Sequence, residues 1–318
     1  MRFSVFVALA WATLGQAGSF NRVWSRYSFD VADEDRSTWM SNIPDYIELS
    51  ALSIPGTHNS ATRNIQNDMF QSQNTDIADQ LKGGIRYLDV TGRVKNDAIQ
   101  IYSAGFDTGF KLEQVLATIF EFLKENNRET VILRISKDIL GSATDEAFEN
   151  FIYDYLMSDA ARDYIKLPTL TRNYRAPKLG ELRGKLFILQ DFSTKTKGRF
   201  GLRWGSRGVS VSNYRFAIGP LGRAVKWPFI AWGIYWAGQE KENRLHITHS
   251  SVALGTIAPY KTAGGKDDNK QGINDWLGQY LLDGSVGRTG ILSMDFPGQE
   301  LVGMIIRRNA LLYAQRSV

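Results

Sequence analysis

The segment from Leu52 to Ser60 reads LSIPGTHNS and decides how the rest of the chain is interpreted. A short apolar run ends at Pro55 and Gly56, and His58 follows beside an amide and two hydroxyl side chains. The chain contains only three histidines. A histidine just beyond the carboxyl end of a strand lies where barrel enzymes carry their catalytic side chains. The alternative is that His58 is a loop histidine that only forms hydrogen bonds to nearby hydroxyls. The other segments of the chain are needed to choose between these two interpretations.

Strand-like and helix-like patterns alternate outward from this segment along the whole chain. Strands are expected at 49–54, 85–90, 99–102, 130–135, 185–189, 209–211, 245–248 and 290–294. Helices are expected at 75–82, 112–126, 145–157, 273–282 and 299–312. Alternation of this kind predicts an α/β fold with a largely parallel sheet. Eight strands in one domain of this length predict a distorted TIM-type (β/α)8 barrel, and the lack of a glycine fingerprint after the first strand argues against a dinucleotide site.

Composition restricts the classes of partner. The 318 residues are 43% hydrophobic and carry a net charge of +5, and the sequence pI is about 9.2. The basic residues are dispersed instead of forming a stripe with aromatic residues, so we expect no nucleic-acid partner. A mildly basic surface is compatible with weak attraction to anionic membranes.

The first 17 residues have the pattern of a secretory signal peptide. Arg2 precedes an apolar run over residues 3–14, and small residues at Gly15 and Ala17 suit a cleavage site. The run is too short to span a bilayer. We therefore expect a secreted protein whose single domain covers residues 18–318 and which acts as a monomer. The chain has no cysteine, so its stability has to come from the core.

Seven short motifs then suggest a family. They lie at residues 39–44, 53–58, 84–89, 122–126, 129–133, 179–185 and 294–296 and read WMSNIP, SIPGTH, GIRYLD, FLKEN, ETVIL, LGELRGK and MDF. In this order they resemble the X domain of phosphatidylinositol-specific phospholipases C, especially the single-domain bacterial kind. The resemblance covers most of the chain and implies a distorted TIM barrel. It also implies a phosphoric diester hydrolase in which one histidine is the general base, a second histidine is the general acid, and an arginine or a calcium ion stabilises the phosphate.

Carried onto this sequence, the resemblance gives His58 the role of general base on the inositol 2-hydroxyl, and Asp295 the role of orienting it. Other expected positions depart from the family. Thr91 stands in the place of the arginine, and Ala104 stands in the place of the second histidine. Loss of the general acid alone lowers a rate by roughly two to four orders of magnitude unless another residue replaces it.

Several residues are candidates for the missing groups. Arg93, Lys137, Asn59 and Asn213 are candidate contacts for the phosphate or the inositol ring. Asn59 and Asp89 also offer oxygen ligands for part of a calcium site, so the expected cofactor is either none or calcium. His246 and His249 are candidate acids. Because these two histidines are three residues apart on one strand, at most one of them can point into the barrel.

Three functional hypotheses follow. The first is a secreted hydrolase of phosphatidylinositol or a related phosphodiester, whose partner is a phosphoinositide-type lipid or a membrane surface. The second is an inactive relative that binds such a lipid without turnover. The third is a carbohydrate-active barrel that uses Asp89 and Asp295 as its carboxylate pair. The aromatic segment from Lys226 to Trp236 is interpreted either as a membrane-docking rim or as an insertion packed on the barrel.

Overall fold

The computed structural model describes residues 25–167, 175–195, 199–217, 221–252, 254–264 and 271–313. The expected signal peptide at residues 1–17 lies outside the described residues. The strands are β1 (Ile54–Thr57), β2 (Tyr87–Lys95), β3 (Ala98–Ser103), β4 (Phe106–Lys111), β5 (Thr130–Lys137), β6 (Ile165–Lys166), β7 (Lys185–Asp191), β8 (Leu202–Arg203), β9 (Val209–Ser212), β10 (Phe216–Ala217), β11 (Leu245–His249), β12 (Leu254–Gly255) and β13 (Ile291–Met294). The helices are α1 (Ile77–Lys82), α2 (Leu112–Glu125), α3 (Asp145–Leu156), α4 (Asp159–Arg162), α5 (Gly222–Gly238), α6 (Pro259–Gly264), α7 (Ile273–Leu282), α8 (Gln299–Arg307) and α9 (Ala310–Tyr313).

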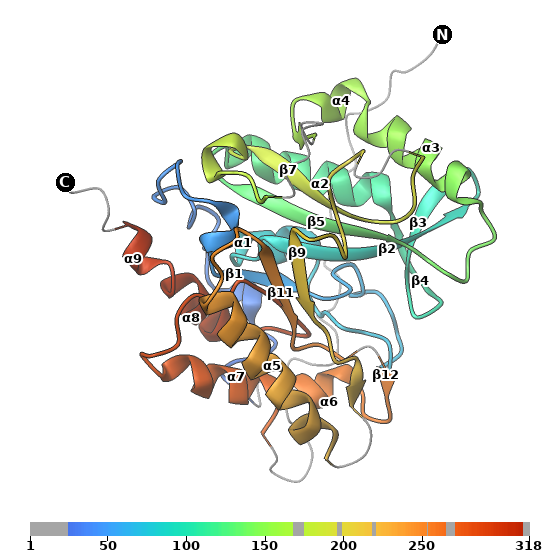
Figure 1. Ribbon diagram of the computed structural model, residues 1–318. Coiled ribbons are helices and arrows are strands. Elements are labelled where there is room, and N and C mark those ends of the chain that lie inside the picture. Colours follow the sequence, from blue (N-terminus) through green and yellow to red (C-terminus); the bar gives the residue numbers. More distant parts are fainter. Residues whose placement is uncertain are drawn as a thin grey trace.

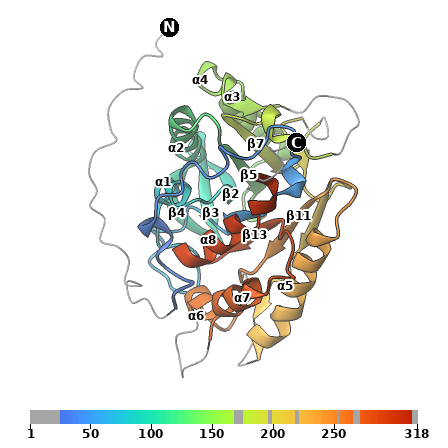
Figure 2. The same cartoon turned by 90° about the vertical axis from the view of Figure 1, so that its left-hand side faces the viewer.

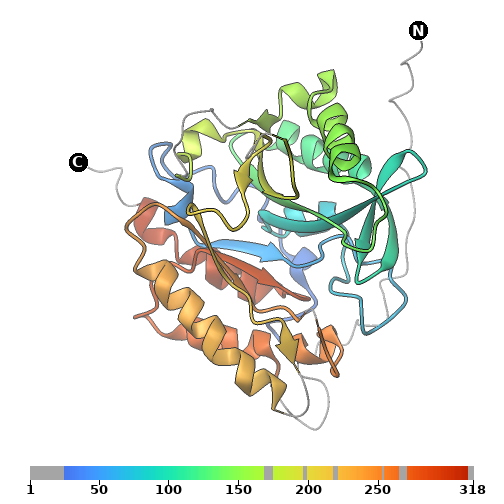
Figure 3. The same ribbon diagram turned by 45° about the vertical axis from the view of Figure 1, so that its right-hand side comes forward.

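The main sheet is a curled barrel of parallel strands in the order β8-β7-β5-β2-β1-β13-β11-β9. Figure 3 shows β1 (blue) beside β13 (red), which joins the two ends of the described chain into one sheet. Within the described residues no pairing joins β8 to β9, so the barrel is open at that point. The prediction of a distorted (β/α)8 barrel is confirmed.

Helices cover the outside of this sheet on two sides. In Figure 1 the helices α2 and α3 lie outside β2, β5 and β7, whereas α5, α7 and α8 lie outside β11 and β13. Figure 2 shows α5, α7 and α8 in the view turned by 90°. The helix α2 forms because Leu112, Val115, Leu116 and Ile119 recur at helical spacing, and this face is buried in the core against the sheet. Among the described helices, none is both long enough and apolar enough to cross a bilayer.

Strand alternation separates the two faces of the sheet and places the polar residues. Tyr87, Ile132 and Ile247 point into the inner core of the barrel, and their neighbours Leu88 and Leu133 point outward to the helices. Residues two or four positions after these inward-facing residues therefore also line the interior, at the carboxyl ends of the strands. This rule places the mouth of the barrel at the ends of β1, β2, β5, β7, β11 and β13.

The structure corrects three predicted boundaries. The first strand begins at Ile54 and not at Leu49, because Leu49–Ala51 form a 3-10 helix that leads into it. The last helix is interrupted after Arg307 and resumes as the short α9. The strand expected at 85–90 also extends to Lys95, where it continues into an antiparallel hairpin with β3 and β4.

Candidate active site

His58 lies directly after β1, and its neighbour strand β13 presents Asp295 at the same height. The two strands are in parallel register, with Thr57 opposite Met294, so each next residue continues at the mouth of the barrel. His58 Nδ1 lies 2.9 Å from Asp295 Oδ1, and the other oxygen of Asp295 accepts the backbone N–H of Val252 at 2.8 Å. Both side chains are buried. Because the carboxylate accepts from Nδ1, the other ring nitrogen of His58 is left as an acceptor and can act as a base.

The backbone around His58 is held rigidly. Gln73 donates from Nε2 to the carbonyl of His58 at 2.8 Å and to the carbonyl of Met294 at 2.9 Å. Asn59 adopts a positive φ of 45°, which turns the chain away from the strand. Gly56 is required below the histidine, because a Cβ there would lie 2.7 Å from the Cβ of Tyr87. The segment Leu52–Ser60 therefore fixes the imidazole by backbone geometry, as a catalytic base requires.

Arg134 supplies the cation at the mouth, from the interior face of β5. Its guanidinium donates to Asp89 at 2.6 Å and also to Asp191, and it lies over the ring of Trp204 at 4.4 Å. Burial opposes the charge of Arg134, but the carboxylates of Asp89 and Asp191 outweigh it and raise its pKa. Arg134 is therefore permanently charged and is fixed between two carboxylates.

The two remaining histidines lie at opposite ends of β11. His249, the last residue of the strand, points into the barrel, with its ring centroid 6.0 Å from that of His58 and the rings nearly perpendicular. His246 points outward and places Nε2 2.5 Å from Glu240 Oε2. The prediction that at most one of them faces the interior is confirmed, and that residue is His249.

The environment of His249 determines its charge. Burial lowers the pKa of His249 well below 6.5, and the nearby charges of His58, Arg134, Lys226 and Arg215 lower it further. Its Nδ1 lies 3.4 Å from Ser251 Oγ, and its Nε2 is buried without a hydrogen-bond partner in the described structure. The imidazole is therefore neutral at pH 7 and has one nitrogen available to a ligand.

Of the other candidate contacts, Arg93 and Lys137 are already engaged by carboxylates. Arg93 donates twice to Asp138, at 2.7 and 3.1 Å, and lies over the ring of Tyr102. Lys137 pairs with Asp145 at 2.5 Å. Lys137 and Arg134 are three residues apart on β5 and so face opposite sides, which is why Arg134 and not Lys137 reaches the interior. Asn213 follows β9 at the mouth of the barrel.

Thr91 and Ala104 do not carry the groups expected from the family. The hydroxyl of Thr91 lies 2.7 Å from that of Ser136, and the two form a hydrogen bond. Ala104 lies in an exposed turn between β3 and β4, with a φ of 47°. The cation and the second imidazole at the mouth come instead from β5 and β11.

A calcium site does not fit these residues. The carboxylate of Asp89 is bonded to Arg134, and in the described part of the chain no three His, Cys, Asp or Glu side chains form a group that could hold a metal ion. Asn59 then remains as a single candidate ligand, which is too few for calcium. The carbohydrate-active hypothesis fails for a related reason, because Asp89 is paired with Arg134 and Asp295 with His58.

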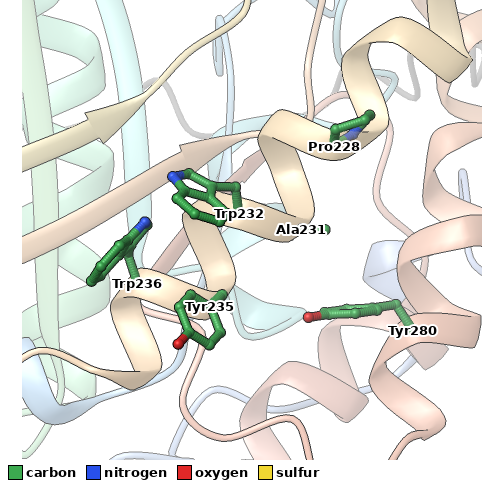
Figure 4. A pocket seen from close by; sticks show the side chains of 6 residues that line it. All are labelled: Pro228, Ala231, Trp232, Tyr235, Trp236 and Tyr280. Carbon is green, nitrogen blue, oxygen red and sulfur yellow. The ribbon is translucent and has the colours of Figure 1, made fainter.

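The aromatic segment forms most of α5, and one face of it packs on the barrel. Ile230 and Ile234 are buried against the sheet and α7, so the prediction of a packed insertion is confirmed for this face. On the other face Pro228, Ala231, Trp232, Tyr235 and Trp236, with Tyr280 of α7, line an open hollow of about 410 Å³ (Figure 4). The hollow lies on the outside of the barrel, so it is separate from His58.

Reasoning from sequence missed Arg134, Tyr87 and Trp204 as parts of the mouth. The signal for Arg134 was a charged residue inside the apolar run Val131–Ile135, because a charge inside a central strand requires buried partners. Tyr87 gave no signal, since its buried hydroxyl lies in a strand that looks entirely structural. Tyr87 OH, Arg134 Nε and His249 Nε2 are buried without partners in the described structure, so this interior can still form hydrogen bonds to a polar ligand.

Comparisons with known proteins show which family the chain resembles. A family model of the phosphatidylinositol-specific phospholipase C X domain matches residues 47–191. The 1-phosphatidylinositol phosphodiesterase of Listeria monocytogenes is 30% identical over 292 residues, which cover 85% of this chain and 84% of the relative. The corresponding enzyme of Staphylococcus aureus strain Newman is 24% identical over 170 residues, or 52% of this chain and 54% of that protein.

Solved structures show the same fold. The phosphatidylinositol-specific phospholipase C from Listeria monocytogenes superimposes with a TM-score of 0.72 at 28% identity, over 86% of this chain and 99% of that one. A form of the Staphylococcus aureus enzyme gives a TM-score of 0.69 at 18% identity, over 88% of this chain and 99% of that one, which is a likeness of fold alone.

Proposed function

Because the chain belongs to the family of phosphatidylinositol-specific phospholipases C, we propose that it cleaves the phosphodiester bond of phosphatidylinositol. The observation that carries the proposal is the pair of His58 and Asp295 at the mouth of the barrel, 2.9 Å apart and buried. Asp295 accepts from one ring nitrogen and leaves the other free to take a proton. A protein that only bound the lipid would not need an imidazole fixed in this way.

The proposed reaction begins with His58. Its free nitrogen takes the proton of the inositol hydroxyl adjacent to the phosphate, and the resulting oxygen forms a bond to phosphorus. The bond from phosphorus to the diacylglycerol oxygen breaks, and that oxygen takes up a proton. The products are diacylglycerol and a cyclic inositol phosphate. Positioning and charge supply most of the rate in transfers of this type.

We propose His249 as the second proton-transfer group. It is the only other histidine that faces the barrel interior in the described structure. Its imidazole is neutral when the site holds no anion, because burial and the surrounding cations disfavour its charged form. The negative charge of a bound phosphodiester opposes these cations, so His249 can gain a proton in the complex and deliver it to the leaving oxygen.

Arg134 is proposed to order the part of the site that faces the inositol ring. It bridges Asp89 and Asp191 from the centre of β5. The bridge leaves carboxylate oxygens and the buried Nε of Arg134 facing the interior, where the hydroxyls of a polyol can bond to them. Asn213, at the end of β9, is a further candidate contact for the ring.

We further propose that the mouth approaches a lipid surface. Four exposed apolar side chains lie at this end of the barrel, namely Met69, Ile139 and Leu140 in connections and Phe106 at the start of β4. The ring of Phe70 stacks on Phe106 at 4.4 Å, and Leu140 lies beside the turn at Gly105, so these residues form one patch. An exposed apolar patch next to a site for a lipid headgroup suits an enzyme that works at a membrane. Secretion and action as a monomer also remain proposals.

Hydrolysis of lipid vesicles tests the proposal. Vesicles of phosphatidylinositol should release a water-soluble cyclic phosphate with the wild-type chain and not with His58→Ala, and vesicles of phosphatidylcholine should release none. The assay is run with calcium and with a chelator, and equal rates are expected because the residues do not form a calcium site. Equal background release by the two proteins would refute the enzyme, and vesicle binding in the same sample would then favour a lipid binder.

A further inference from the structure

A lysine is fully buried against the barrel next to the active site. Lys226 lies on the inward face of α5, together with Ile230, Ile234 and Ala237, and its exposed fraction is 0%. The other three residues of this face are apolar and pack on the sheet. A lysine at such a position is unusual, because burial of an ammonium is unfavourable unless it is paired.

The ammonium of Lys226 is only partly compensated. Its Nζ donates to the carbonyl of Tyr214 at 2.5 Å. No carboxylate forms an ion pair with it within the described part of the chain, although an ammonium has three protons to donate. A methionine or leucine would fill this position without the desolvation penalty, so packing does not account for the choice of a lysine.

The position of Lys226 relates it to the active site. Tyr214 follows β9, so its carbonyl holds the ammonium at the mouth of the barrel. The charge of Asp295 favours the ammonium, and the ammonium in turn disfavours a charge on His249. Ser212 of β9 pairs with Thr248 of β11, so the segment after β9 that holds Lys226 through Tyr214 lies beside His249 at the end of β11.

We propose that Lys226 is a positioning residue of this site, whose buried positive charge favours the phosphate anion beside His249 and Asp295. The inference rests on the proposed hydrolysis and names a residue that no family motif includes. Lys226 lies on a helix outside the sheet and has no exposed surface, so its charge acts at a distance, through the potential at His249, and not by contact with the substrate. It adds from α5 a second positive charge to that of Arg134 on β5.

The inference predicts a pH dependence. Burial lowers the pKa of Lys226 to about 8, with the charge of Asp295 partly offsetting this effect. Activity should therefore fall as the pH rises through about 8, because the ammonium loses its proton there. The groups that face His249 and respond to pH or carry charge are His58, Arg134, Arg215 and Lys226, and the two arginines stay charged throughout this range.

Two substitutions test the role. Lys226→Arg keeps the charge to much higher pH, so it should retain activity and lose the decline near pH 8. Lys226→Met removes the charge at similar volume, so it should lower kcat/KM at pH 7 by about tenfold to a hundredfold and also lack that decline. A decline that stays unchanged in Lys226→Arg would overturn the inference. The melting temperature of Lys226→Met should equal or exceed that of wild type, whereas a purely structural lysine would give a lower one.

A titration followed by NMR keeps the test independent of folding of the variants and of catalysis. The chain has three histidines, so the resonance of His249 can be assigned by comparison with His249→Gln. In the wild-type protein this resonance should show a step with its midpoint near pH 8, as Lys226 titrates. Absence of the step would overturn the inference even if hydrolysis is observed. A step without any hydrolysis would instead retain the electrostatic coupling and refute the proposed function.

Discussion

The barrel has a buried histidine–carboxylate pair at each end, and the two pairs differ in their surroundings. At the carboxyl end of the strands, His58 Nδ1 lies 2.9 Å from Asp295, and at the amino end His246 Nε2 lies 2.5 Å from Glu240. All four side chains are almost inaccessible to solvent. A histidine bonded to a carboxylate is therefore not by itself a sign of catalysis.

The difference lies in what remains unsatisfied nearby. Around Glu240 the bonds are complete, because Arg244 Nε donates to it at 2.9 Å and the backbone N–H of Glu242 at 2.5 Å. Around His58, by contrast, buried polar atoms of Tyr87, Arg134 and His249 have no partner in the described structure. A saturated pair stabilises the fold, whereas an unsaturated one can bind a ligand, as expected for the two ends of a barrel.

Among substitutions in the two pairs, Asp295→Asn is expected to have the largest effect on activity. The side-chain amide of asparagine carries no negative charge, so it cannot replace the carboxylate that accepts from His58 Nδ1. The imidazole therefore loses its orientation and the stabilisation of its protonated form. We expect kcat/KM for phosphatidylinositol to fall by about three orders of magnitude. The matched change at the other end, Glu240→Gln, should leave it unchanged. Similar losses in both variants would mean that the two pairs do not differ in role.

His249→Gln should have the next largest effect. Glutamine fills a similar volume and can form one hydrogen bond, but it cannot transfer a proton. The expected loss is about a hundredfold in kcat, measured on vesicles and on a water-soluble phosphodiester substrate. His246→Gln serves as the control, since its imidazole faces outward to Glu240. An unchanged kcat in His249→Gln would contradict a role for the second imidazole at the mouth.

A smaller effect is expected from Arg134→Lys. Lysine keeps the positive charge, but it lacks the planar fork that bonds to Asp89 and Asp191 together. We expect KM to rise by about tenfold with a smaller change in kcat, because the ring contacts and not the proton transfers are disturbed. A change in kcat alone, at constant KM, would instead place Arg134 in the chemical step.

The smallest effect on catalysis is expected at the amino end, where stability should change instead. Glu240→Gln should lower the free energy of unfolding at pH 7 by about 1–3 kcal/mol, because it weakens buried bonds to His246 and Arg244. Bonds to these groups outweigh the opposing effect of burial and lower the pKa of Glu240 to about 2, from an ordinary value of 4.5. The contribution of the charged form is therefore complete above pH 4.5 and lost as the pH falls through about 2.

Urea titrations at several pH values measure this effect. The difference in free energy between wild type and Glu240→Gln should be constant near neutral pH and should narrow as the pH approaches 2. A difference that grows on acidification would have the wrong sign for a carboxylate with a lowered pKa.

Local patterns predicted much of the fold and the central pair of the site. The strand expected at 185–189 begins at the first residue of β7, and the helix expected at 273–282 coincides with α7. The hydrophobic residues of these elements recur with a clear period, and turn residues mark their ends. The pairing of His58 with Asp295 followed from the family resemblance, and the opposite orientation of His246 and His249 followed from strand alternation alone.

The parts that sequence could not predict depend on register or on contacts between distant segments. The sequence makes Lys137 a candidate contact and leaves Arg134 out, because it does not show which face of β5 lines the barrel. Lys226 gave no signal, since the segment that forms α5 is apolar on all sides and shows no helical period. The partners of Asp89 and Arg93 are Arg134 on β5 and Asp138 directly after it, and only the assembled sheet places them together.

The most direct test of the difference between the two ends compares His58→Ala with His246→Ala in the same assays. We expect His58→Ala to reduce phosphatidylinositol hydrolysis by about three to four orders of magnitude. We expect His246→Ala to keep the wild-type rate and to unfold more easily by about 1–3 kcal/mol, because Glu240 loses its buried partner. Wild-type activity in His58→Ala, or an equal loss of activity in both variants, would contradict the assignment of catalysis to the pair at the mouth.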